Sequence, residues 1–274
     1  MIKTDFASLV NTLCKDQNPR VWSLLVSVFG ELGQDQSVRI SGSLLTHLTN
    51  LMGIKPEATR VAIHRLRKEG WIESQKVGRK SNYFLSSKGL EQSATASPLI
   101  YCEQAPIDQA WVVIFEPNSQ NDNRPHEGIW ITSSILLTTK APKVRNALVT
   151  ELDGKSEIPS WITAKICDPA VLKYSQQLAT TFADLEGKLR SPTDLSPIEI
   201  AALRILIVHA WRLAVLKAPN LSHPFFPTSW KGPDCRTSVL SLLTRLPGQK
   251  VADLEAETIH LSSRSPTVCP ETTV

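Results

Sequence analysis

The segment KPEATRVAIHRLRKEGWIESQKVGRKSNYFLS, residues 55–86, decides the fold, because it predicts a helix followed directly by a β-hairpin. Pro56 suits the first turn of a helix, where its missing N–H has no intrahelical partner. Helical spacing places four apolar residues on a packed face: Ala58, Val61, Ala62 and Leu66. A second face carries Arg60, His64 and Arg67 at spacings of four and three residues. Gly70 is a typical residue to end such a helix.

The hairpin begins immediately after this glycine. Residues 71–77 and 81–85 predict two strands, and Gly78-Arg79-Lys80 predicts a cationic turn between them. Residues 55–88 contain three acids and nine basic residues, namely Lys55, Arg60, Arg65, Arg67, Lys68, Lys76, Arg79, Lys80 and Lys88. Their net charge of +6 exceeds the +4 of the whole chain, so the positive charge is local. A local basic patch is typical of a surface that binds phosphates.

Two interpretations of this charge compete. Charged runs also occur on ordinary solvated helices, but a helix joined directly to a cationic hairpin favours DNA binding. Arg side chains can pair with guanine in the major groove, while Lys side chains and backbone N–H groups hold phosphates. We expect these DNA contacts: Thr59, Arg60, His64, Arg67, Lys76, Arg79, Lys80 and Ser81. Arg65 is ambiguous, since it can instead pair with Glu69 one helical turn later.

The elements expected before this segment, together with its helix and hairpin, follow the order of secondary structure in a known fold. Residues 5–15 and 20–32 predict helices, residues 38–41 a short strand, and residues 44–52 a helix that Ser41 or Ser43 can cap. Helix, strand, helix, turn, helix and hairpin is the order of a winged helix-turn-helix. We therefore expect a DNA-binding domain over residues 1–90.

This segment resembles the winged helix of the PaaX family of bacterial transcriptional repressors. The likeness rests on ATRVAIHRL at 58–66, Glu69-Gly70-Trp71, GRKS at 78–81 and Tyr83-Phe84-Leu85. The resemblance implies a homodimeric repressor of a catabolic operon that is released by an acyl- or aryl-CoA thioester. It also extends to residues 170–245, and loosely to 106–168, where the helix rich in Arg that family members carry is replaced by a short polar loop.

The rest of the chain predicts an α+β protein that is predominantly helical. Ser, Ala, Gln and Pro predict a linker over 91–105, and a small α+β module follows over 106–168. Within the module we expect strands at 109–115, 128–131, 135–137 and 161–166, and a helix at 144–151. Residues 169–247 predict a C-terminal helical domain, and residues 248–274 predict a flexible tail.

The helix predicted from residue 197 to 217 is apolar on nearly all sides, and it starts with the capping box Ser196–Glu199. Arg204, His209 and Arg212 interrupt it and can share one sector. Buried guanidinium groups require anions. Either Asp184, Glu186 or Asp234 supplies them internally, or an effector does. With Trp211 and Trp230 these three form the expected effector site, although core packing is the commoner use of such aromatic residues.

Composition narrows the classes of function. The chain has 274 residues, 42% hydrophobic and 20% charged, as is usual for globular proteins of two or three modest domains. Five separated cysteines indicate neither a zinc site nor a disulfide framework. The usual catalytic motifs are missing, so we expect no enzyme, no resident cofactor and no metal. The expected partners are operator DNA, a small-molecule effector and a second copy, in the cytoplasm and without a membrane.

Two other hypotheses stay open. The chain can be an architectural DNA-binding protein without a ligand, in which case internal carboxylates neutralise Arg204, His209 and Arg212. It can also be an enzyme that processes acyl-CoA thioesters and carries a winged helix, with Cys167 or Cys235 and His209 as a possible nucleophile pair.

Overall fold

The structure is a computed structural model that describes residues 4–15, 20–78, 80–116 and 127–264. The chain divides into two compact units. Unit 1 contains residues 1–97, 184–209 and 241–274, and unit 2 contains residues 98–183 and 210–240. The architecture is α+β, with helices in the majority and one small antiparallel sheet in each unit, as the sequence predicts.

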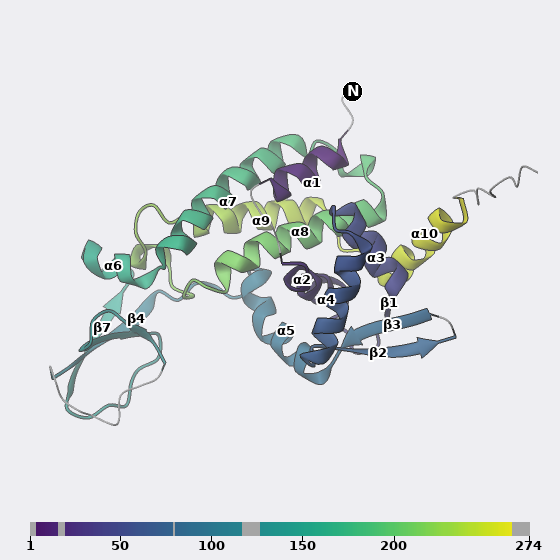
Figure 1. The fold of residues 1–274 in the computed structure, drawn as a ribbon. Coiled ribbons are helices and arrows are strands. Elements are labelled where there is room, and N and C mark those ends of the chain that lie inside the picture. Colours follow the sequence, from purple (N-terminus) through teal and green to yellow (C-terminus); the bar gives the residue numbers. More distant parts are fainter. Residues whose placement is uncertain (1–3, 16–19, 79, 117–126, 265–274) are drawn as a thin grey trace, which may run out of the picture. The chain divides into compact units, whose positions relative to one another are not determined.

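The helix and hairpin of the opening segment are present in unit 1. The elements run α2 (Val21–Leu32), β1 (Ile40–Ser41), α3 (Gly42–Leu51), α4 (Pro56–Lys68), β2 (Ile72–Val77) and β3 (Lys80–Leu85), which confirms the predicted order. The sheet has the order β1-β3-β2, and all its pairs are antiparallel. Helix α4 packs on α2 and α3, and the hairpin β2–β3 begins next to its end (Figure 1).

Local chemistry explains these boundaries. The side chain of Ser41 caps α3 by accepting a hydrogen bond of 3.1 Å from the Leu44 amide. Helix α4 starts at Pro56 and ends one residue before Glu69, after which Gly70 adopts a φ of 72°. Gly78 likewise has a φ of 61° at the tip of the hairpin. Side chains with a Cβ rarely adopt such angles, so glycine is required at both turns.

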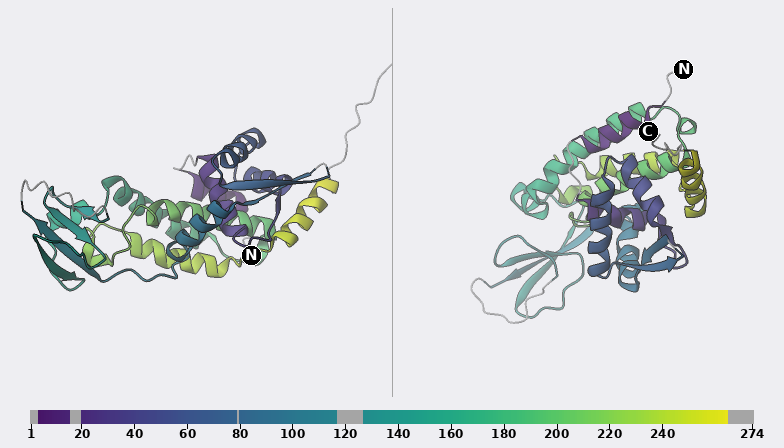
Figure 2. Two further views of the ribbon diagram at one scale, coloured as in Figure 1. Left: turned by 90° about the horizontal axis from the view of Figure 1, so that it is seen from below. Right: turned by 45° about the vertical axis from the view of Figure 1, so that its right-hand side comes forward.

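The core of this part comes from the facing sides of its three helices. Its fully buried side chains include Leu24, Leu25, Val28 and Phe29 of α2, Leu44, Leu45 and Leu48 of α3, and Leu66 of α4. Burying one such side chain contributes about 1.5–3 kcal/mol relative to its exposure. This core therefore fixes the orientation of α4, while the left view of Figure 2 shows the hairpin extending away from the helices.

Other helices complete the two units. Helix α1 (Phe6–Cys14) belongs to unit 1, and helices α7 (Pro169–Lys188), α8 (Pro197–Val215) and α9 (Gly232–Arg245) contribute residues to both units. The predicted capping box is confirmed, since the Ser196 amide donates to the Glu199 carboxylate over 2.8 Å and the Glu199 amide donates back to Ser196 Oγ. Among the described residues, no helix has the length and apolar character needed to cross a membrane.

Unit 2 contains the second sheet. Its strands are β4 (Gln109–Phe115), β5 (Ile129–Trp130), β6 (Ile135–Thr138) and β7 (Ala147–Asp153), in the order β5-β6-β4-β7 (Figure 2). Strand β4 matches its predicted bounds. The core beside the sheet contains Ala110, Leu137, Ile166, Leu221, Phe225 and Trp230. Most of the expected polar loop at 116–127 lies outside the described residues.

Two predicted irregular segments are wrong. The linker expected at 91–105 is largely helix α5 (Ser87–Ile100), because Ser86 Oγ caps it by accepting from the Gly89 amide over 3.1 Å. The tail expected at 248–274 contains helix α10 (Val251–Arg264), which packs on α3 and β1 and buries Leu254 and Thr258. Residues 265–274 of that tail lie outside the described residues.

Two predicted elements of unit 2 are exchanged in type. The segment expected as a helix at 144–151 forms strand β7, because it pairs with β4 along its whole length and Asn146 precedes it at a φ of 55°. The segment expected as a strand at 161–166 forms helix α6 (Ser160–Ile166). There Thr163 and Ile166 are buried three residues apart, which is the spacing of a helix.

Candidate nucleic-acid interface

The outward face of α4 carries the charges that the sequence predicts. Arg60, His64 and Arg67 are all exposed, and 74% of the Arg60 side chain is accessible. Glu57 in the first turn lies 3.8 Å from the Arg60 guanidinium and is equally exposed. A pair this exposed is worth little in water. Arg60 therefore remains available to other partners.

Two residues of α4 do not lie where the sequence predicts. Thr59 is wrong as a DNA contact, because it is fully buried and its hydroxyl lies 2.8 Å from the hydroxyl of Thr49. Val61 is wrong as a core residue, because it is 70% exposed. The packed face is turned by about one residue from the predicted one, so it consists of Thr59, Ala62, Ile63 and Leu66.

A groove separates α4 from the hairpin. It has a volume of about 650 Å³ and is lined by His64, Arg67 and Lys68 of α4 together with Ile72, Glu73 and Ser74 of the hairpin side. The basic residues that line the groove belong to α4, whereas the hairpin side contributes the acidic residue Glu73. Five of its six lining residues are polar or charged, so the groove suits an extended anionic partner better than an apolar small molecule.

The hairpin adds further cations. Lys76 and Lys80 are exposed on β2 and β3, where Lys76 pairs in register with Ser81, and Ser81 is half-buried. The expected contact Arg79 lies outside the described residues. Phosphate contacts of this kind require long, exposed cationic side chains, and both lysines meet this requirement.

Contacts inside unit 1 hold α4 and the sheet in place. Arg65 pairs with Glu69 over 2.7 Å, as the sequence allows, and its guanidinium lies 4.6 Å from the centre of the Trp22 ring. The Glu255 carboxylate of α10 accepts hydrogen bonds of 2.7 Å from both the amide and the hydroxyl of Ser41. Ser41 ends β1 and precedes α3. Its contact with Glu255 therefore holds the start of α3 against α10. No local pattern in the sequence predicts this contact, because the two residues lie 214 positions apart.

The polar residues of α8 that lie in unit 1 have internal partners. Arg204 Nε lies 2.5 Å from Glu31 of α2, and the two side chains are only 11% and 5% exposed. Arg204 also donates to the carbonyl oxygens of Leu243 and Leu246 at the end of α9. The internal alternative therefore applies to Arg204, with Glu31 as partner and not Asp184, Glu186 or Asp234. His209 Nδ1 lies 3.0 Å from Ser27 Oγ in a buried contact.

The expected effector residues of unit 2 are also mostly internal. Trp211 is buried, and its indole N–H donates to the Ile100 carbonyl over 3.0 Å. Trp230 stacks on Phe226 with ring centres 4.9 Å apart, inside the core of this unit. Burial lowers the pKa of the Arg212 guanidinium. The two tryptophans thus serve core packing, the commoner alternative.

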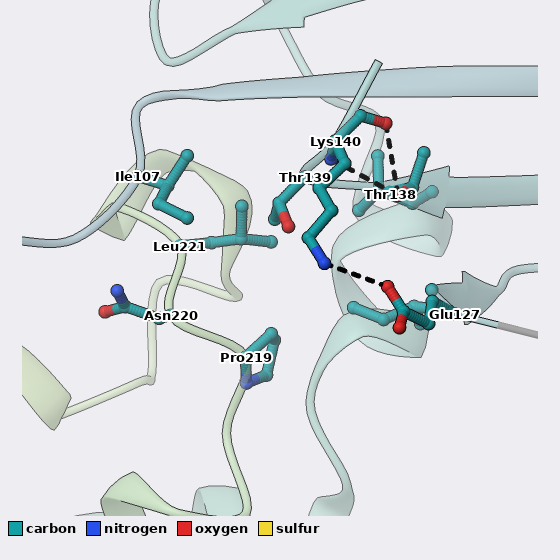
Figure 3. Close-up of a pocket in the computed structure, with 11 residues that line it drawn as sticks. Ile107, Glu127, Thr138, Thr139, Lys140, Pro219, Asn220 and Leu221 are labelled. Atoms are coloured by element: carbon teal, nitrogen blue, oxygen red, sulfur yellow. Dashed lines mark hydrogen bonds and ion pairs between the residues drawn. The ribbon is translucent and has the colours of Figure 1, made fainter. Parts of the chain in front are cut away.

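Unit 2 contains a cavity that the sequence did not indicate. It has a volume of about 310 Å³, with apolar walls from Ile107, Ile129, Leu137, Pro219 and Leu221. Figure 3 shows Ile107, Pro219 and Leu221 on one side and Lys140 on the other, where its ammonium group pairs with Glu127 over 3.1 Å. A cavity with apolar walls and a charged edge can accept a small amphipathic ligand.

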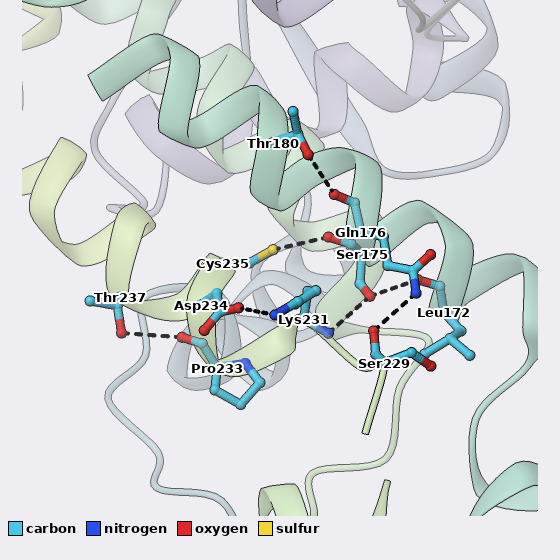
Figure 4. Close-up of polar contacts among 10 residues, drawn as sticks. All are labelled: Leu172, Ser175, Gln176, Thr180, Ser229, Lys231, Pro233, Asp234, Cys235 and Thr237. Carbon is cyan, nitrogen blue, oxygen red and sulfur yellow. Dashed lines mark hydrogen bonds and ion pairs between the residues drawn. The ribbon is translucent and has the colours of Figure 1, made fainter. Parts of the chain in front are cut away.

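Cys167 and Cys235 are both buried, which is unfavourable for the nucleophile pair considered above. Burial, followed by the charge of Asp234, raises the pKa of Cys235 to about 12, and burial with Asp168 raises that of Cys167 to about 11. Cys235 instead donates to the Ser175 carbonyl, and Ser175 Oγ accepts from the Lys231 amide, which ties the start of α9 to α7 (Figure 4). Within the described parts of the chain, no cluster of ligands suits a metal.

Comparison with known proteins agrees with the geometry. The model of the PaaX-like protein family matches residues 20–89, and that of the PaaX-like protein C-terminal domain matches residues 169–251. The two matches span more than half of the 274 residues, and the chain belongs to the PaaX family. The first match contains α2, α3, α4 and the hairpin.

One curated relative is the transcriptional repressor PaaX of Escherichia coli (strain K12). It is 24% identical over 251 residues, which cover 82% of this chain and 79% of the relative. That protein is a repressor and the family is not one of enzymes, so the expectation that this chain is not an enzyme is confirmed on that ground.

Proposed function

We propose that this chain is a transcriptional repressor that binds operator DNA through a winged helix-turn-helix and is released by a small-molecule effector. The observation that carries the proposal is the cationic outward face of α4 beside a hairpin that carries Lys76 and Lys80. In this role α4 is the recognition helix, α3 crosses the DNA backbone, and the hairpin is the wing. The similarity to a named transcriptional repressor supports the sign of regulation.

The proposed DNA contacts divide into two groups. Arg60, His64 and Arg67 of α4 would face base edges in the major groove, where arginine pairs with guanine through two hydrogen bonds. Lys76 and Lys80 would contact phosphates, which position the protein but carry no sequence information. Thr59 leaves the first group because it is buried.

We place the protein in the bacterial cytoplasm as a homodimer. Two copies would set their recognition helices in successive segments of the major groove, about 34–36 Å apart, on a partly palindromic operator. An effector would release the DNA only by binding more tightly to a geometry in which this spacing is lost.

For the effector we retain the class of acyl- or aryl-CoA thioesters, and we place its apolar portion in the cavity of unit 2. The cavity is supported by its apolar walls and by Lys140 at its edge. Its volume of about 310 Å³ is near the lower end of ligand pockets, so it would accept an acyl or aryl group and leave a nucleotide outside. This placement replaces Arg204, Trp211 and Trp230 as effector contacts, because their polar groups or rings already have internal partners.

A ligand-independent architectural protein is the second candidate. One observation favours it: Arg204 is neutralised by the internal carboxylate of Glu31. The two candidates differ in whether a metabolite changes DNA binding.

An electrophoretic mobility shift separates them. Purified full-length protein would be titrated on DNA from upstream of its own gene, first alone and then with a panel of acyl- and aryl-CoA thioesters and the matching free acids. Release by one thioester and not by its free acid supports the proposal. Binding that no compound changes supports the architectural candidate, equal binding to unrelated DNA would contradict the repressor, and no binding to any DNA would contradict both.

A further inference from the structure

Val61 is an apolar residue at an exposed position of α4, where a folded helix usually carries a polar side chain. It is 70% exposed, which is the largest exposure of any large hydrophobic side chain among the described residues. It lies in the second turn of α4, directly after Arg60. A single exposed apolar residue is common on protein surfaces, so its significance depends on its surroundings.

Its surroundings are the cationic face itself. At about 100° per residue, Val61 lies roughly 150° around the helix axis from the middle of the face formed by Thr59, Ala62, Ile63 and Leu66. It is therefore close to the centre of the outward face. The exposed residues around it there are Glu57, Arg60, His64, Arg65 and Lys68, and all of them are charged or titratable.

Folding does not account for a valine at this position. Valine loses side-chain freedom in a helix and is a weaker helix former than alanine, lysine or glutamate. Because 70% of its surface stays in contact with water, it regains little of this cost by burial. The residue thus weakens α4 slightly as a free helix. A gain on binding a partner would compensate for that cost.

We propose that Val61 determines operator specificity by packing against the 5-methyl group of a thymine in the major groove. The proposal rests on the DNA-binding function given above. Thymine is the base that presents a methyl group in that groove, and apolar side chains are its natural contacts. The neighbouring Arg60 and His64 would supply the hydrogen bonds to base edges, and Val61 would supply an apolar contact beside them.

Uracil replacement tests this directly, since it removes the 5-methyl group and leaves the base pairing intact. A site would be selected from random-sequence duplex DNA by full-length protein, and each thymine in it would be replaced singly by uracil. Dissociation constants would be measured by fluorescence anisotropy for the wild type, Val61→Ala and the control Ile259→Ala. Ile259 is a matched control because it is 56% exposed on α10, outside the cationic face.

For the wild type and for Ile259→Ala we expect one uracil replacement in each half-site to weaken binding about threefold to fivefold, as the loss of one buried methyl predicts. Val61→Ala loses this contact in both half-sites, so it should bind the thymine duplex about ninefold to twenty-five-fold more weakly, and it should not respond to that replacement. Equal uracil sensitivity in Val61→Ala and the wild type would overturn the proposal while leaving the repressor function intact. If no sequence is selected at all, the DNA-binding function fails and this proposal fails with it.

Discussion

The ion pair between Arg204 and Glu31 yields the sharpest prediction about stability. The two side chains are 11% and 5% exposed, so replacing Glu31 by leucine leaves a guanidinium buried without its carboxylate. Breaking a buried pair from one side costs about 3–5 kcal/mol in the free energy of unfolding. Arg204→Met should cost a similar amount, because it also removes the hydrogen bonds to the carbonyls of Leu243 and Leu246.

The double variant Glu31→Leu/Arg204→Met separates pairing from packing. Replacing both charges by apolar groups removes the unpaired charge, so it should cost at least ~2 kcal/mol less than the sum of the single variants. Urea unfolding followed by circular dichroism measures all three. Asp184→Asn serves as control, because the pair of Asp184 with Lys188 is about half exposed and should be worth less than ~1 kcal/mol. A Glu31→Leu cost as small as that of the control would refute the reasoning.

Two further predictions concern residues that position α4. Thr59→Val should lower the free energy of unfolding by about 1 kcal/mol through loss of its contact with Thr49, and it should leave the sequence preference in DNA binding unchanged, as urea unfolding and anisotropy titrations would show. A changed preference would return Thr59 to the reading face. Glu255→Ala should cost about 1–2 kcal/mol and speed hydrogen exchange at the Ser41 amide, whose acceptor it removes; an unchanged exchange rate would contradict the role of α10.

Arg204 and His209 of α8 were predicted to bind an effector, but in the structure they contact side chains of α2. Arg204 connects α8 to Glu31 of α2, and His209 contacts Ser27 of the same helix. Helix α2 in turn packs on α4. Within unit 1, these residues therefore attach the proposed reading helix to α8, a helix that also contributes residues to unit 2.

Local patterns predicted most of unit 1. The elements from α2 to β3 follow helical spacing, a serine cap and glycines at turns, all of which are local in sequence. Prediction failed where tertiary contacts decide. Strand β7 exists because it pairs with β4. Helix α10 packs on α3 and β1 of its own unit, buries Leu254, and places Glu255 against Ser41, more than 200 residues earlier.

For the candidate site, the sequence predicted the exposed basic residues correctly but misplaced the faces of α4. Charge and spacing identified Arg60, His64, Arg67, Lys76 and Lys80, all of which are exposed. The faces of α4 were misplaced by about one residue. Val61 and Ile63 are both apolar, and only packing on α2 and α3 decides which of them is buried. The partner of Arg204 could not be found from sequence, since Glu31 lies 173 residues away.

The most direct test of the central claim compares Arg60→Ala with Lys80→Ala in anisotropy titrations on operator and random DNA at several salt concentrations. If α4 reads bases and the hairpin holds phosphates, Arg60→Ala should weaken operator binding by about 1–3 kcal/mol and random DNA far less. Lys80→Ala should weaken both alike and reduce the slope of log K against log salt by about 0.9. Equal losses on both DNAs for Arg60→Ala would contradict the assignment of α4 as the reading helix.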